Sequence, residues 1–68
     1  MALPTSVESA YTKVRHAAEA LGAKNRELET AKASGDEDRA KNAQDAYKSA
    51  AKTLVAAAKE LQSAAEKL

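Results

Sequence analysis

The sequence has no cysteine, no tryptophan and no phenylalanine, and only one histidine and two tyrosines among its 68 residues. Without cysteine, disulfide frameworks, thiolate nucleophiles and cysteine-based zinc sites are excluded, and one histidine does not supply the ligands of a transition-metal site. Isoleucine is also absent, whereas the cores of β-sandwiches and β-barrels draw on β-branched and aromatic side chains. These absences exclude the all-β classes.

The chain is also short, nearly neutral and free of long apolar runs. A chain of this length forms at most one small domain and buries only about 60% of its unfolded surface, so we expect no deep catalytic cleft. Eleven basic and ten acidic side chains give a net charge of +1, which is typical of neither a polyanion-binding tail nor an acidic segment. The longest purely apolar run, residues 54–58, is far shorter than the ~20 residues of a membrane span, and the first residues lack a signal-peptide core. Together with the missing cysteines, this predicts a cytoplasmic protein without a cofactor.

What the sequence does contain favours α-helix almost throughout. Eighteen of its residues are alanine, and most of the others are lysine, glutamate, leucine, arginine and glutamine, which are strong helix formers. The only interruptions are one proline near the start and two glycines. We therefore expect one domain, residues 1–68, with a helix over about 5–33, a turn over about 34–36 and a second helix over about 37–67.

Capping residues mark the ends of these helices. Helix 5–33 should begin near Thr5 or Ser6, because Thr5 can cap the first free N–H groups while Glu8 completes a capping box. Gly35 can adopt the left-handed conformation that ends a helix, and Asp36 can cap the helix that follows. The sequence thus predicts a tight turn between two helices.

The apolar residues recur with a heptad spacing that predicts how the two helices meet. In both helices, large residues occupy one core position of the heptad and alanine occupies most of the other. A short turn makes the helices antiparallel, and in most layers of the resulting seam a bulky aliphatic side chain faces an alanine. The layers are Leu3/Leu68, Val7/Ala64, Ala10/Leu61, Val14/Ala57, Ala17/Leu54, Leu21/Ala50, Lys24/Tyr47, Leu28/Ala43 and Ala31/Ala40. The predicted fold is an all-α antiparallel hairpin with coiled-coil-like packing, in which the stem of Lys24 lies along the ring of Tyr47 and its ammonium reaches water.

The two sides of this seam differ in character. On one side, the polar flank, Lys13 should lie near Glu60 and Glu27 near Arg39, so this side is expected to be solvated. The opposite side, the apolar flank, is made of small or apolar residues apart from Asn25. Its residues are Tyr11, Ala18, Gly22, Ala51, Val55, Ala58 and Ala65.

The apolar flank is the predicted interaction site. A hairpin with an alanine-dominated interior is short of apolar burial, and covering this flank with another helical surface is the simplest remedy. We expect the hairpin to pair into a four-helix bundle, as a two-fold symmetric homodimer or with a partner helix. Tyr11 is a candidate interface anchor, and Gly22, which weakens a helix interior, is expected to allow close packing.

No residue pattern points to catalysis or metal binding. His16 is predicted to face outward without co-ligands, and the acidic stretch 36–38 lacks the alternating ligands of a calcium loop and is better explained as a helix cap. Ser34, Ser49 and Ser63 have no paired general base. We therefore predict a non-enzymatic interaction module that serves as an assembly part, an adaptor or an inhibitor.

A second hypothesis comes from basic residues on the outside of the helices. In layout, a hairpin that dimerises into a four-helix bundle is similar to the Rop-type plasmid regulators, although no sequence motif is shared. The similarity is one of layout and transfers no function, but the basic stripe itself, doubled by dimerisation, could form a shallow surface that follows a phosphate backbone. The net charge of +1 and the absence of aromatic side chains for base stacking make nucleic-acid binding the less favoured alternative. The residues that would serve it are Arg15, Lys41, Lys48, Lys52 and Lys59.

Overall fold

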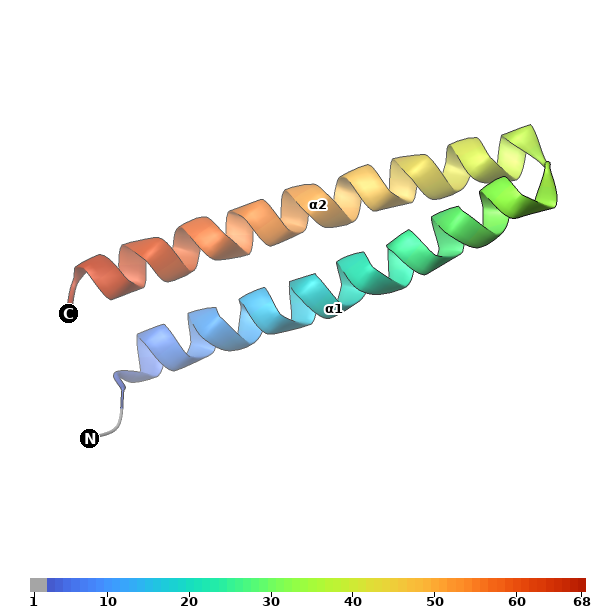
Figure 1. Cartoon of the computed structure of the whole chain (residues 1–68). Coiled ribbons are helices and arrows are strands. Elements are labelled where there is room, and N and C mark those ends of the chain that lie inside the picture. The colour runs from blue at the N-terminus through green and yellow to red at the C-terminus, as the bar shows by residue number, and fades with distance from the viewer. Residues whose placement is uncertain (1–2) are drawn as a thin grey trace.

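Two long antiparallel helices joined by a tight turn make up the protein. The computed structural model describes residues 3–68, in which α1 runs over Thr5–Ser34 and α2 over Glu37–Glu66. The helices lie side by side, and the start of α1 and the end of α2 lie at the same end of the hairpin (Figure 1). The predicted all-α hairpin is confirmed, and no strand occurs between residues 3 and 68. Residues 1 and 2, which the expected domain includes, lie outside the described part of the chain.

The start of α1 differs from the predicted capping box. Pro4 occupies the cap position, and no side chain caps the helix; instead the Pro4 carbonyl accepts hydrogen bonds from the backbone N–H groups of Val7 and Glu8, at 3.0 and 3.1 Å. Thr5 is already inside the helix, so its hydroxyl is not at the position from which it could cap. The reason is that proline has its φ angle set near −65° and therefore starts a helix readily. The helix begins where expected, but the capping box was wrong.

The turn is formed as predicted. Gly35 has a φ angle of 76°, in the left-handed region, and its N–H donates to the carbonyl of Lys32. Asp36 is extended and its carboxylate accepts the Arg39 backbone N–H at 3.1 Å, which caps α2. Ser34 adds two hydrogen bonds, donating its hydroxyl to the Ala31 carbonyl at 2.6 Å and accepting from the Asp36 N–H at 3.3 Å. Because these contacts are local, the sequence was sufficient to predict them.

The seam between α1 and α2 contains the predicted residues. Every member of the nine layers is buried or half-buried except Leu3 and Leu68 at the open end. The fully buried residues are Val7, Ala10, Ala17, Ala31 and Ala57. On the polar flank, Lys13 Nζ lies 2.9 Å from Glu60 Oε1, as the expected register requires. The heptad pattern therefore predicted both the buried face of each helix and their alignment.

The charged residues around the Lys24/Tyr47 layer are arranged differently from the prediction. Glu27 does not pair with Arg39: no ion pair joins them among the described residues, and Glu27 instead lies 3.4 Å from the ammonium of Lys24. In the register of the seam layers, where Ala31 faces Ala40, Arg39 lies level with residue 32, about 7.5 Å along the axis from Glu27 at 1.5 Å per residue. Lys24 is half-buried, with 40% of its side chain exposed, and Tyr47, which faces it in the seam, is half-buried as well.

The hairpin is long and only one helix thick. Its Cα atoms extend over 51 × 17 × 10 Å, with a radius of gyration of 15.5 Å, whereas a compact domain of this length has a radius of about 11 Å. Both broad faces of the helix pair are consequently open to solvent. The core is a single row of side chains between α1 and α2.

Candidate functional site

The apolar flank is exposed along the half of the hairpin that holds the chain ends. Tyr11 is 55% exposed and Val55 is 54% exposed, and apart from Leu3 and Leu68 at the open end they are the exposed large apolar side chains among residues 3–68. Around them, Ala18, Ala58 and Ala65 are exposed, while Gly22 and Ala51 are half-buried. Helix periodicity places all seven predicted residues on the side of the seam away from the Lys13–Glu60 pair, and Tyr11 and Val55 are the large exposed side chains among them.

Gly22 has no packing role inside the hairpin. A Cβ atom built there would meet only the Arg26 guanidinium, with Nη1 at 3.8 Å, which is an ordinary van der Waals distance. The expectation that Gly22 allows close packing is thus not met within the chain. A glycine in a helix interior costs about 1 kcal/mol relative to alanine, so its place on an exposed apolar flank has no explanation in the hairpin itself.

The polar flank contains two hollows that the sequence reading missed. One, of about 480 Å³, is lined by alanines and bordered by Lys13 and Glu60. The other, of about 670 Å³, lies nearer the turn beside Glu27 and Arg39. The alanines that line the first hollow are Ala17, Ala20, Ala56 and Ala57, and those that line the second are Ala23, Ala31, Ala43 and Ala46. Alanines at positions 20, 23, 46 and 56, beside the seam, indicate these hollows in the sequence. They were not inferred because charged residues lie next to them.

The two flanks offer different prospects for docking. On the polar flank the alanines lie in hollows, and a partner would have to cover the exposed Lys13–Glu60 ion pair, whose desolvation opposes burial. On the apolar flank the protruding side chains are Tyr11 and Val55, which release more apolar surface from water than alanine does. The apolar flank is therefore the better candidate interface.

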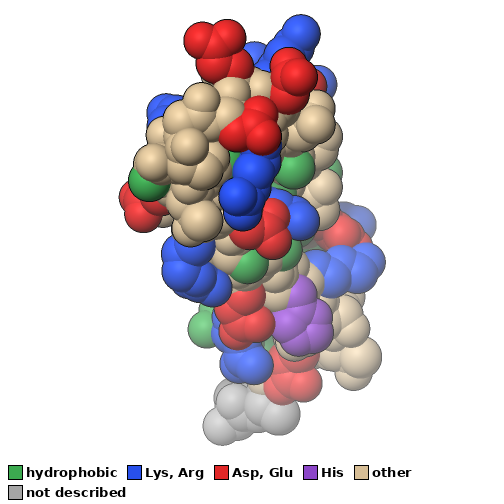
Figure 2. All heavy atoms as spheres, turned by 90° about the vertical axis from the view of Figure 1, so that its right-hand side faces the viewer, with side chains coloured by type: hydrophobic (Ala, Val, Ile, Leu, Met, Phe, Trp, Pro, Cys, Tyr) green, Lys and Arg blue, Asp and Glu red, His purple; other side chains and the backbone are tan. Residues whose placement is uncertain are grey.

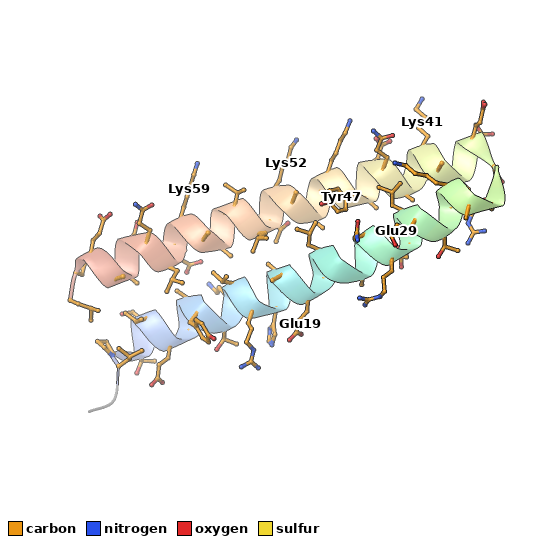
Figure 3. All side chains as sticks on the ribbon, in the orientation of Figure 1. Glu19, Glu29, Lys41, Tyr47, Lys52 and Lys59 are labelled. Carbon is orange, nitrogen blue, oxygen red and sulfur yellow. The ribbon has the colours of Figure 1, made fainter. Side chains whose placement is uncertain are left out.

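The predicted basic row lies on the outer side of α2. Lys41, Lys52 and Lys59 point away from α1 (Figure 3), and Lys48 and Arg15 are exposed as well. Acidic residues interrupt the same outer surface, and a view onto the turn end shows lysine, arginine, aspartate and glutamate side chains intermingled (Figure 2). Such a mixture does not create the continuous positive field that tracks a phosphate backbone.

The remaining predicted candidates show no assembled chemical site. His16 is exposed, and residues 3–68 hold no cluster of three or more histidine, aspartate or glutamate side chains that could bind a metal ion. Ser34 is occupied in the turn, and Ser49 and Ser63 are exposed on α2. Neither α1 nor α2 has the length of apolar sequence that crossing a lipid bilayer demands.

Comparisons with known proteins do not add a functional assignment. No family model matches the chain, and neither a curated protein nor a solved structure matches it. The exposed surfaces of the hairpin are therefore the features from which its function can be inferred.

Proposed function

We propose that this protein is a non-enzymatic helical interaction module that docks another helical surface on its apolar flank and so completes a four-helix bundle. In that role it serves as an assembly part, an adaptor or an inhibitor of its partner. A chain without cysteine gains nothing from an oxidising compartment, so we propose that it acts in the cytoplasm.

The observation that carries this proposal is the large accessible surface. The hairpin exposes 5105 Å². A compact monomer of 7.1 kDa exposes about 4100 Å², so the excess is about 1000 Å². One partner in a stable protein–protein interface contributes about 800 Å². The surplus surface is therefore of the size that one docked partner covers.

The composition of the core supports the same conclusion. Four of the five fully buried residues are alanines, and the fifth is Val7. Alanine contributes little apolar area, and chains shorter than about 70–80 residues rarely gain more than about 3–5 kcal/mol from one core. Covering Tyr11 and Val55 adds burial of larger side chains; because each is only about half exposed, the gain is roughly half of the ~1.5–3 kcal/mol that complete burial contributes.

A pair of matched cross-linking variants tests the proposal. Ala58 and Ala56 are both exposed on α2, but Ala58 lies on the apolar flank and Ala56 borders a hollow of the polar flank. We expect a photoreactive benzophenone residue at position 58 to give covalent adducts with a protein chain in the native cells. The same residue at position 56 should give few. Equal yields at both positions, or none at 58, would contradict docking on the apolar flank.

The outward row of lysines is the one observation that favours the alternative, a dimeric nucleic-acid-binding regulator (Figure 3). If it holds, the double substitution Lys48→Glu and Lys52→Glu should remove a salt-dependent affinity for RNA or DNA. Fluorescence anisotropy with a labelled duplex at low ionic strength decides the question. No binding by the unmodified protein ends this alternative.

A further inference from the structure

We infer that the occupant of the apolar flank is a second copy of this chain, turned end for end, so that Tyr11 of each copy lies over the helical turn that holds Gly22 of the other. This inference rests on the proposed function and specifies its partner and geometry. Three observations carry it: the spacing of large and small residues on the flank, the distribution of charge along it, and the unexplained glycine.

The first observation is a shared centre on the two helices. A two-fold axis that crosses the flank at right angles to the helices places α1 on α1 and α2 on α2, each pair antiparallel. On α1, the midpoint between Tyr11 and Gly22 falls between residues 16 and 17. On α2, the midpoint between Ala51 and Ala58 falls between residues 54 and 55. Because Ala17 and Leu54 face each other in the seam, both midpoints lie at one level, and a single axis serves both helices.

The contacts made around this axis are complementary in size. A two-fold interface requires that if one residue contacts a second, the second contacts the first in return. The exposed ring of Tyr11 in one copy packs against Gly22 of the other. Glycine has no side chain, and the hairpin itself does not fill the space above it. Ala51 meets Ala58, small against small, and Val55 meets its own copy beside the axis. Large-on-small and small-on-small contacts let the helices approach closely.

The second observation is that charge divides the flank into two halves. By heptad position, the same side carries Lys32, Lys41 and Lys48 against Glu29 and Glu37 toward the turn, a net charge of +1, all of them exposed. Toward the chain ends the charges of Glu8 and Arg15 cancel. A dimer with both turns at the same end would bring these two positive halves together, and like charges would oppose association. The end-for-end arrangement moves them to opposite ends. Lys32 and Lys41 then lie beyond the overlapping part of the two hairpins.

The third observation is Gly22 itself. Helices favour alanine over glycine at interior positions, and no contact within the hairpin requires glycine here. A partner side chain seated at this point does require it, since any side chain would occupy the place of the Tyr11 ring. The interface thus accounts for the one residue of α1 that the hairpin does not explain.

Sedimentation equilibrium of the purified protein tests both whether the partner is a second copy and whether Tyr11 packs against Gly22. We expect the unmodified chain to be dimeric and Gly22→Leu to weaken the dimer by about tenfold or more, because a bulky side chain displaces the partner's ring. The matched control is Ala33→Leu, on an exposed position near the turn and away from the interface. Circular dichroism should show both variants to be helical. A monomeric unmodified protein, or equal dimerisation of both variants, overturns the inference.

Disulfide trapping distinguishes the two orientations, and the natural absence of cysteine leaves no background. In the end-for-end dimer, position 55 lies beside the axis and faces its own copy, whereas position 25 faces the region near residue 8. We expect Val55→Cys to form a covalent dimer under mild oxidation and Asn25→Cys to remain unlinked. In a dimer with both turns at the same end each residue lies level with its own copy, so linkage at position 25, with or without linkage at 55, would overturn the proposed geometry. Linkage at neither position in a protein that sediments as a dimer would place the interface elsewhere and overturn it too.

These outcomes separate this inference from the proposed function. If the purified protein is monomeric while a benzophenone at position 58 captures a different chain in cells, the interaction module stands and the second copy is wrong. If the dimer forms but position 58 gives no adducts, docking on the apolar flank is wrong altogether.

Discussion

The two glycines predict opposite effects of the same substitution, because only one of them has a backbone conformation that needs glycine. Gly35 has a φ angle of 76°, and no neighbouring atom lies within 4 Å of a Cβ built there. Gly22 lies inside α1, where a Cβ meets only Arg26 Nη1 at 3.8 Å. Gly35→Ala therefore introduces backbone strain without a clash, whereas Gly22→Ala improves helix propensity without strain.

The magnitudes follow from these two conformations. The left-handed region costs about 1–2 kcal/mol for a residue with a Cβ, and alanine exceeds glycine by about 0.8–1.0 kcal/mol in a helix interior. The entropy of unfolding is about 2.1 cal/mol/K per residue, so 1 kcal/mol shifts the Tm of a 68-residue protein by about 7 °C. We expect Gly35→Ala to lower the Tm by about 7–14 °C and Gly22→Ala to raise it by about 6–7 °C.

Thermal unfolding followed by circular dichroism measures both changes. Because Gly22 lies in the proposed interface, both variants should be made in an Ala58→Glu background, which we expect to prevent association, and compared at low protein concentration. Gly35→Asn is the matched control, since asparagine tolerates the left-handed region and should lose less stability than alanine. A shift of the same sign for both alanine variants would refute the reasoning from backbone conformation.

Three further predictions concern the cap, the seam and the ion pair. Asp36→Ala should lower the free energy of unfolding by about 0.5–2 kcal/mol, because it removes the cap of α2. Thr5→Ala should be near neutral, because Thr5 does not cap α1. Urea unfolding measures both changes, and a larger loss for Thr5→Ala would contradict the structure. Ala10→Leu should destabilise by about 1–3 kcal/mol in the same assay, since Ala10 is 1% exposed and borders no hollow; a neutral result would mean that the layers are misaligned. A double-mutant cycle on Lys13 and Glu60 should give a coupling of only about 0.2–1 kcal/mol that falls with added salt, because both side chains are more than half exposed; a coupling insensitive to salt would argue against a surface ion pair.

Most of the hairpin could be predicted because its causes are local or periodic. Gly35 and Asp36 define the turn through their own backbone preferences, and the heptad spacing places residues such as Val7 and Ala57 in the seam. The misjudged start of α1 shows the limit of this reasoning. Thr5 and Glu8 match a capping box in sequence, but Pro4 occupies the cap position and Thr5 is the first residue of the helix, so Thr5 does not cap it.

The candidate interface could be predicted only in part. The sequence places Tyr11 and Val55 on one side of the seam, and their exposure in the structure agrees with that placement. It did not reveal that Gly22 lacks a contact within the chain, because that depends on how far the side chains of α2 reach across the flank. Nor did it reveal the alanine-lined hollows of the polar flank, which depend on how two helix surfaces meet.

By itself, the sequence determined that this chain is helical, where it turns, and which stripe of each helix is apolar, because propensity, capping and periodicity act over a few residues. Only the tertiary structure decided which surfaces remain open and which charges pair. Glu27 pairs with Lys24 and not with Arg39, and the hairpin stays one helix thick, because both outcomes depend on the distances between two whole helices. Such distances are set by packing along the entire seam, which no short stretch of sequence encodes.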